Sequence, residues 1–245
     1  MVLANPPANA LSEAMIDALQ SALDAAAEDA SVRVVVIAAE GKLFSGGHDL
    51  KEMSAHRGDA DSGRGYFEDI FSRCSRMMQT ILALPKPVVA EVAGLATAAG
   101  CQLVASCDVV IASATARFGV NGIDVGLFCS TPMVALSRSI GPKAALDMLM
   151  TGEMIDADRA LAAGLVSRIA QPDLLRAETD ALIDRLLARP PHVLALGKKA
   201  FYEQLRMPIA DAYRFASATI VDNMLMAEAK EGIAAFVEKR KANWT

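Results

Sequence analysis

The sequence has few aromatic residues, cysteines and histidines, and each scarcity excludes a class of protein. Phe, Trp and Tyr make up 5% of the 245 residues, and no basic patch is interleaved with them, which argues against nucleic-acid binding. The four cysteines form no Cys-x-x-Cys pair, and together with three histidines they offer no spacing for a tetrahedral metal site. We therefore expect no metal, no nucleic-acid partner and free thiols in a reducing compartment.

The chain also lacks a strong charge of one sign, a long apolar run and a signal-peptide pattern. Its 24 basic and 29 acidic residues give a net charge of −5. The uncharged stretch 92–107 contains Gly, Thr, Gln and Ser and is too short to span a bilayer. The first ten residues, MVLANPPANA, have no basic region followed by an apolar one. These absences predict a soluble, cytoplasmic protein without a membrane partner.

What the chain does have is a hydrophobic content of 53%, supplied mostly by Ala, Val, Leu and Ile, in alternating strand and helix patterns. Ser12 is placed to cap a helix. Apolar runs predict strands over 32–39, 87–92, 109–113 and 165–169. Helices are predicted over 66–84, 102–106, 142–149 and 156–163, and the polar stretch 54–65 is predicted to be a mobile loop. This alternation favours an α/β fold with right-handed crossovers.

The pattern changes in the last third of the chain. From Pro172 onward no strand signal remains, and four helical stretches follow, broken at Pro190–Pro191 and at Pro208. We therefore predict an α/β core over residues 1–190 and a helical region over residues 191–245.

The stretch Gly94 to Asp108, GLATAAGCQLVASCD, carries the strongest functional signal. It has the pattern of a small-residue turn that leads into a helix, so that a ligand can approach the main chain. N–H groups at a helix start are unpaired and lie at the positive end of the helix dipole. Such groups suit an oxyanion that develops on a carbonyl or thioester.

A second glycine-bearing turn, FSGGHDL over 44–50, follows a predicted strand. The His48 N–H could supply a second oxyanion donor facing the Ala99 N–H, or the segment could be only a tight strand-to-helix turn. The His48 imidazole could exchange protons near neutral pH, although local packing is the alternative that we favour. Asp49 could orient a ligand, but an aspartate at a helix start is more often a cap.

Three further places have both a structural and a functional interpretation. Asp124 is the sole carboxylate in the glycine-punctuated segment 116–132, where it could brace the loop or act in catalysis. Cys129 has no base near it in the sequence, which argues against a nucleophile. The basic cluster 239–241 could be a solvated helix end or could pair with phosphates.

The two small-residue turns, about fifty residues apart, resemble those of the crotonase family, also called the enoyl-CoA hydratase/isomerase family. The similarity extends through LANPPANALS, PKPVVAEVAG, SCDVVIAS, TGEMIDADRALAAGLV and FVEKRKANW, and so covers nearly the whole chain. The resemblance implies a spiral core of ββα turns. It also implies C-terminal helices that assemble homotrimers, often paired into dimers of trimers.

The resemblance implies particular roles for residues of both turns. An acyl-CoA thioester carbonyl would be bound between the backbone N–H groups of His48 and Ala99. Coenzyme A would enter as part of the substrate, without a separate cofactor. The residues expected along the CoA are Gly46, Asp49, Leu50 and Lys51, with Phe236 and Lys239 approaching from the same or a neighbouring subunit.

The chain departs from the family pattern where proton transfer would occur. The family's hydratases carry two glutamates, at positions that correspond here to Gln102 and Gly122. Hydration needs such a pair, because one group activates water while the other exchanges a proton with carbon. A glutamine cannot exchange that proton at neutral pH, so restoring glutamate at both positions should raise hydration.

Three functions stay open on this reading, and the sequence does not decide whether the chain is an enzyme. The first is an acyl-CoA-binding protein that stabilises a thioester enolate but has weak or no ordinary hydratase activity. The second is an active enoyl-CoA hydratase or isomerase of fatty-acid metabolism with a non-standard acid or base: Asp124, His48 or a water held by Gln102. The third is a non-catalytic acyl-CoA-binding regulator.

Overall fold

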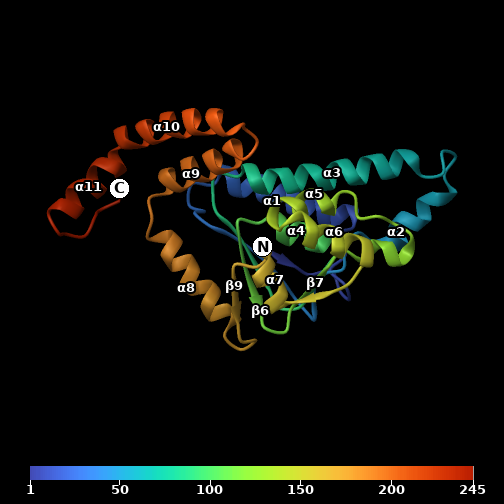
Figure 1. Cartoon of the computed structure of the whole chain (residues 1–245). Helices are drawn as coiled ribbons and strands as arrows, with labels where there is room; N and C mark the ends of the chain where they lie inside the picture. The colour runs from blue at the N-terminus through green and yellow to red at the C-terminus, as the bar shows by residue number, and fades with distance from the viewer. Residues whose placement is uncertain (245) are drawn as a thin grey trace.

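The computed structural model describes residues 1–244, which form two sheets with helices packed around them (Figure 1). The first sheet is parallel and has the order β1-β2-β4-β6-β9, with strands Val2–Leu3, Val35–Ala39, Val88–Val92, Val109–Ser113 and Arg168–Ala170. The second has the order β3-β5-β7-β8, with strands Leu43–Ser45, Leu95–Thr97, Arg117–Gly119 and Ile155–Asp156. In the second sheet β7 and β8 pair antiparallel.

From β2 to β7, successive strands alternate between the two sheets, and each pair of strands leads into helices. The pairs β2–β3, β4–β5 and β6–β7 each place one strand in the first sheet and the next in the second. Helices follow each pair: α2 (Leu50–Ala55) and α3 (Arg64–Ala83), then α4 (Ala99–Ser106), then α5 (Pro132–Ser139). This repetition is the expected spiral of ββα turns, and the α/β crotonase-like fold is confirmed.

The remaining helices begin and end largely at the predicted signals. They are α1 (Glu13–Glu28), α6 (Pro142–Thr151), α7 (Ala157–Ala163), α8 (Leu175–Leu187), α9 (Pro191–Gln204), α10 (Ile209–Leu225) and α11 (Ala227–Val237), with 3₁₀ turns η1 (His56–Gly58) and η2 (Asn121–Val125). The Ser12 hydroxyl accepts the Met15 N–H at 3.3 Å and caps α1. Gly164, at φ +93°, ends α7.

Four predictions differ from the structure, because composition does not by itself set backbone conformation. The predicted helix over 102–106 begins earlier, at Ala99 of α4. β2 begins at Val35 instead of residue 32, and the last strand covers 168–170 instead of 165–169. Leu165 and Val166 are buried in the core, but not as a strand. The stretch 54–65, predicted to be a mobile loop, contains the end of α2, the η1 turn and the start of α3.

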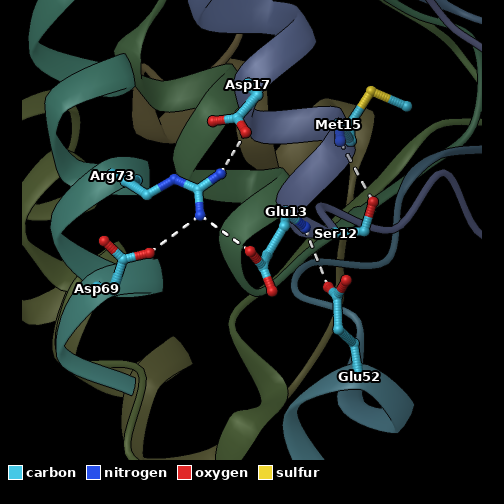
Figure 2. A network of polar contacts seen from close by, with 7 residues as sticks. All are labelled: Ser12, Glu13, Met15, Asp17, Glu52, Asp69 and Arg73. Carbon is cyan, nitrogen blue, oxygen red and sulfur yellow. Dashed lines mark hydrogen bonds and ion pairs between the residues drawn. The ribbon is translucent and has the colours of Figure 1, made fainter. Parts of the chain in front are cut away.

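A polar network fixes the helices beside the turn at residues 44–50 (Figure 2). Arg73 of α3 forms ion pairs with Glu13 and Asp17 of α1 and with Asp69 of its own helix. Glu52 of α2 accepts the Glu13 N–H at 3.0 Å. A carboxylate at a helix N-terminus is favourable for the helix dipole, so α1 holds both α2 and α3 in place.

The C-terminal helices differ in how they meet the core. Burial lowers the pKa of Lys198 on α9, and its ammonium lies 2.7 Å from the Asp108 carboxylate and 2.8 Å from the Ile81 carbonyl. Tyr202 of the same helix donates to Asp108 at 2.9 Å. Figure 1 shows α10 and α11 extending away from the sheets. The predicted division at residue 190 falls between α8 and α9, and as a domain boundary it stays a prediction.

Candidate active site

The two small-residue turns lie against each other. Gly47 has φ +88°, and a Cβ added there would lie 2.9 Å from the Ala98 Cβ and 3.1 Å from the Ala99 nitrogen. A Cβ added to Gly100 would overlap the Ser45 carbonyl oxygen. Glycine is therefore required at both positions for the backbones to come this close.

The turn that leads into α4 holds a residue in an unfavourable conformation; in chain order it is the second turn, and the turn over 44–50 is the first. Ala98, with φ +49° and ψ −122°, precedes the first residue of α4. Such a conformation is costly for a residue with a Cβ. The Ala98 N–H is fixed by the Gly119 carbonyl at 3.0 Å. The Ala99 N–H then stands at the first helical position, where it has no acceptor within the helix.

In the turn at residues 44–50, the two backbone N–H groups that precede His48 are hydrogen-bonded, whereas the His48 N–H is not. Gly46 donates to the Ala8 carbonyl at 2.8 Å, and Gly47 donates to the Ser45 hydroxyl at 3.2 Å. Within residues 1–244, neither the His48 N–H nor the Ala99 N–H donates to a loop carbonyl or a side chain. These two amides are therefore free to bind a ligand.

The side chains that follow in the first turn have distinct surroundings. The Asp49 carboxylate accepts the N–H groups of Lys51 at 2.9 Å and Glu52 at 3.2 Å, so it caps α2. Leu50 and Lys51 are exposed. The His48 ring packs edge-on against Phe71, with 5.2 Å between the centroids. Burial lowers the pKa of the His48 imidazole, which favours its neutral form.

The nearby stretch 54–65 also holds aromatic rings together. His56, within the stretch predicted to be a mobile loop, stacks on Tyr66 at a centroid distance of 3.8 Å. The Asp59 carboxylate contacts the His56 ring at 2.9 Å. These contacts hold the η1 turn against the start of α3, with bends and turns over 59–63 between them.

Gln102 stands in the first turn of α4, three residues after Ala99. Its side chain is buried, and its Oε1 has no hydrogen-bond partner in the described part of the chain. The Ser106 hydroxyl donates to the Gln102 backbone carbonyl, and the side chain takes no part in that bond. A buried unpaired acceptor of this kind calls for a ligand or a water.

Gly122 has no room for a side chain. A Cβ added there would lie 2.6 Å from the Leu127 carbonyl oxygen and 2.8 Å from the Cys129 sulfur. The Cys129 sulfur also accepts the Gly122 N–H at 3.3 Å. The idea that glutamate could be restored at both family positions is therefore wrong for Gly122, because the backbone of 127 and the thiol of 129 fill its space.

Asp124 lies at the surface of the η2 turn and supports that turn. Its carboxylate accepts the Asn121 amide at 3.4 Å. A Cβ added to Gly152, at the end of α6, would lie 3.0 Å from the other Asp124 oxygen. These contacts favour the bracing role over the catalytic one.

Sequence reasoning missed a polar contact at the ends of two neighbouring strands of the second sheet, β5 and β7. The Thr97 hydroxyl donates to the Asn121 side-chain oxygen. Thr97 ends β5 and Asn121 follows β7, so this bond ties the Ala98–Ala99 turn to the η2 turn. The two residues are 24 positions apart in the sequence, so no local sequence pattern could have revealed their contact.

The two C-terminal residues expected near the CoA are not near the first turn in the same chain. Phe236 of α11 is 84% exposed, and Lys239 follows at φ +56°. Figure 1 places α11 and α2 at opposite ends of the molecule. A contact of these residues with the first turn would therefore need a second subunit.

Within residues 1–244, no group of three or more His, Cys, Asp or Glu side chains is placed to hold a metal ion. Of the helices described, none is both long and apolar enough to cross a membrane.

Comparison with known proteins matches the whole chain. A family model described as enoyl-CoA hydratase/isomerase covers residues 1–245. A crystal structure of enoyl-CoA hydratase from Mycobacterium smegmatis is 51% identical, with a TM-score of 0.94 over 99% of this chain and 93% of that one. Human enoyl-CoA hydratase domain-containing protein 3 has a crystal structure that is 45% identical, with a TM-score of 0.94 over 99% of this chain and 94% of that one.

A curated relative corrects one expectation and supports another. Enoyl-CoA hydratase domain-containing protein 3 of Xenopus laevis is 46% identical over 100% of this chain and 82% of the frog protein. Its name and those of its mouse, rat and human counterparts describe mitochondrial proteins. The expected cytoplasmic location is contradicted by these names. The resemblance in sequence is confirmed, and this chain belongs to the enoyl-CoA hydratase/isomerase family.

Proposed function

We propose that the chain binds an acyl-CoA thioester, with the thioester oxygen between the N–H groups of His48 and Ala99. The observation that carries this proposal is the contact of the two turns, in which Gly47 lies against Ala98 and Ala99. Two unpaired amides on adjoining turns suit one oxygen that gains negative charge. Coenzyme A enters as part of the ligand, and the proposal needs no separate cofactor.

The chemistry that these amides favour is formation of a thioester enolate. When the His48 imidazole or a water held by Gln102 accepts a proton from the α-carbon, charge moves to the carbonyl oxygen, where the two N–H groups stabilise it. Ordinary hydration is weak in this proposal, because Gln102 cannot transfer a proton at neutral pH and Gly122 has no side chain. Each missing acid or base typically costs about 10²–10⁴ in rate.

Two alternatives are each favoured by an observation. A non-catalytic acyl-CoA-binding regulator is favoured because the two carboxylates near the site have structural roles: Asp49 caps α2 and Asp124 braces η2. An active hydratase or isomerase of fatty-acid metabolism needs a non-standard acid or base. The unpaired ring nitrogens of His48 and a water held by Gln102 are the candidates for that role.

The proposal also assigns the CoA moiety and the assembly. The CoA would lie along the turn at residues 44–50, in contact with Gly46, Asp49, Leu50 and Lys51. Phe236 and Lys239 would come from a neighbouring subunit, because α11 and α2 are far apart within one chain (Figure 1). The corresponding assembly is a homotrimer or a dimer of trimers.

Calorimetry with butyryl-CoA and single-turnover hydration of crotonyl-CoA together test the proposal. We expect saturable binding of butyryl-CoA and hydration far slower than that of ordinary hydratases. Binding without any turnover over a broad acyl-CoA panel would select the regulator. Absence of binding to every acyl-CoA would reject the proposal.

A further inference from the structure

The segment that follows α11 folds back along that helix. Lys239, at φ +56°, turns the chain. The Arg240 guanidinium then donates to the Glu231 carboxylate of α11 at 2.6 Å and 2.8 Å. The Asn243 N–H donates to the same carboxylate at 2.8 Å, and Figure 1 shows the end of the chain turned back beside α11. One carboxylate of α11 therefore holds this return segment, residues 240–244, at two points.

Trp244 extends from the return segment to α8. Its indole N–H donates to the Ala188 carbonyl at 3.0 Å. Ala188 is the residue that ends α8, where backbone carbonyls have no partner within the helix. The helix α8 is itself fixed to the first sheet, because its Leu182 packs in one buried cluster with Ile111 of β6. The indole therefore connects α11 to a helix that is held by the core.

A glycine of α11 makes room for the indole ring. A Cβ added to Gly232 would lie 3.0 Å from the Cη2 atom of Trp244 and 3.4 Å from its Cζ3 atom. Gly232 lies inside α11, and glycine inside a helix is less favourable than alanine. The close approach of the ring accounts for a glycine at this position.

A second contact holds the start of α11. Glu228, in the first turn of that helix, contacts the His192 ring of α9, with 2.8 Å between Oε1 and Nδ1. The helix is therefore attached to α9 through Glu228 and to α8 through Trp244. Phe236 and Lys239 lie between these two attachments along the chain, so the attachments determine where both residues are presented.

We infer that Trp244 is a positioning residue for acyl-CoA binding, which anchors α11 to α8 so that Phe236 and Lys239 reach the CoA of the neighbouring subunit. This inference rests on the proposed function, in which those two residues contact the CoA. A helix without its anchor samples several orientations, and only the fraction in the binding orientation contributes to affinity. Trp244 therefore raises the affinity without touching the ligand, because it reduces the cost of ordering α11 on binding.

Calorimetry with butyryl-CoA, using the full chain, tests this role. Trp244→Ala removes the indole N–H and the ring, and it should weaken binding about tenfold, because a smaller fraction of the chains holds α11 in the binding orientation. Gly232→Ala keeps Trp244 but places a methyl group against its ring, and it should weaken binding about threefold for the same reason. Alanine favours a helix more than glycine does, so unwinding of α11 cannot cause the loss in Gly232→Ala.

A matched control and a spectroscopic signal accompany these variants. Gly197 lies inside α9, and a Cβ added there meets no atom of the described chain within 4 Å, so Gly197→Ala should bind butyryl-CoA as the wild type does. Trp244 is the single tryptophan of the sequence, so its fluorescence reports the anchor without a ligand. Acrylamide should quench this fluorescence more strongly in Gly232→Ala than in the wild type or in Gly197→Ala.

A double-mutant cycle separates positioning from a general effect on the fold. Lys239→Met removes the charge that is proposed to approach the CoA, and it should weaken binding by itself. When Trp244→Ala is added to Lys239→Met, the combined loss of affinity should be smaller than the product of the two single losses, because Trp244 acts in part through Lys239. Light scattering should give equal masses for the wild type and Trp244→Ala, which excludes loss of assembly as the cause.

The outcomes distinguish this inference from the proposed function. Wild-type affinity in Trp244→Ala overturns the inference, and acyl-CoA binding still stands. Single losses that multiply in the double variant, unchanged quenching in Gly232→Ala, or a lower mass of Trp244→Ala also overturn it. Failure of the wild type to bind any acyl-CoA rejects the proposed function, and the role of Trp244 in binding is then rejected with it.

Discussion

At the scale of single residues, the position of Gly122 shows how a missing side chain can be built into a loop. The Leu127 carbonyl and the Cys129 sulfur occupy the volume into which any larger residue would project. The thiol bonds to the Gly122 amide. The packing of the η2 turn and its surroundings therefore excludes a carboxylate at this position. Changing residue 122 alone would not make room for one.

Replacement of Gly122 by alanine should therefore destabilise the protein by about 1–3 kcal/mol, because the new Cβ must displace backbone. Urea denaturation of wild type and variant measures the difference. Gly58→Ala is the matched control, since a Cβ there meets no atom within 4 Å, and its effect should stay within about 0.5 kcal/mol. Equal stability of the Gly122→Ala variant and the wild type would contradict the packing argument.

Gln102, in contrast, occupies a position where a carboxylate fits. The Gln102→Glu variant should hydrate crotonyl-CoA about tenfold or more faster than the wild type, because it gains one of the two acid–base groups. Burial would raise the pKa of the new carboxyl, so general-base activity should appear only as pH rises through that pKa. Loss of enoyl-thioester absorbance measures the rate, with Gln102→Met as control. A wild type that already hydrates at ordinary enzymatic rates would contradict the weak-hydratase proposal.

The sequence predicted the site's main chain better than its side chains. The small residues of both turns indicated close approach of backbones, because only glycine and alanine leave amides uncovered. The filled space beside Gly122 depends on Leu127 and Cys129, whose positions follow from the fold of the η2 turn. The edge-on packing of the His48 ring likewise depends on Phe71, which is contributed by α3.

At the scale of elements, Arg73 joins two helices with three carboxylates around one guanidinium (Figure 2). These ion pairs raise its pKa. Its side chain is 18% exposed, whereas that of Asp17 is 58% exposed, so solvent screens part of the interaction. Removing the cation would also leave Glu13, Asp17 and Asp69 to repel one another.

Arg73→Met should accordingly lower the free energy of unfolding by about 1–2 kcal/mol, and the loss should shrink at high salt. Thermal denaturation at low and high ionic strength measures it. Arg64→Met on the same helix is the control, because Arg64 has a single, exposed partner in Glu68 and should change stability by less than about 0.5 kcal/mol. A salt-independent loss would show that packing of the Arg73 stem is responsible instead.

Helix α11 carries an ion pair that should be visible in a titration. Arg240 and the Asn243 N–H contact the Glu231 carboxylate and lower its pKa to about 2. A lowered folded-state pKa contributes stability above pH 4.5, the ordinary value, and that contribution is lost as pH falls toward 2.

An NMR titration of the Glu231 carboxyl should thus have a midpoint near 2 in the wild type. In Arg240→Gln the midpoint should rise toward the ordinary value, because the main cause of the shift is gone. Asp29, whose pKa is lowered by hydrogen bonds from Ser31, should titrate alike in both proteins and serves as the reference. An unchanged Glu231 midpoint in the variant would reject the assigned ion pair.

Local sequence signals specified the elements where they act within one turn of chain. The Ser12 cap, Pro142 at a first helical turn and the left-handed Gly164 each fix a helix end through their own backbone chemistry. Apolar runs were less informative, because Leu165 and Val166 are buried without forming a strand. The rest depended on tertiary contacts, such as the stacking of His56 on Tyr66.

At the scale of the whole molecule, the C-terminal helices expose an unusual amount of apolar surface. Ile209 and Tyr213 of α10 are 74% and 71% exposed, and Phe236 and Val237 of α11 are 84% and 72% exposed. Large contiguous apolar surfaces on a folded chain mark interaction sites. In the proposed assembly a second copy covers these helices and brings Phe236 and Lys239 to the CoA of its neighbour.

The mass of the protein in solution tests this assembly. Light scattering at micromolar concentration should give a trimer or a dimer of trimers, because burying these side chains removes apolar surface from water. Ile209→Asp and Phe236→Glu should shift the mass toward the monomer and, in the same variants, weaken acyl-CoA binding, since a neighbour would no longer complete the site. Leu161→Glu is the control, because Leu161 is 41% exposed on α7 of the core, and it should leave mass and binding unchanged. A monomeric wild type that binds acyl-CoA at full affinity would show that one chain holds the whole site, and the roles assigned to Phe236 and Lys239 would then be wrong.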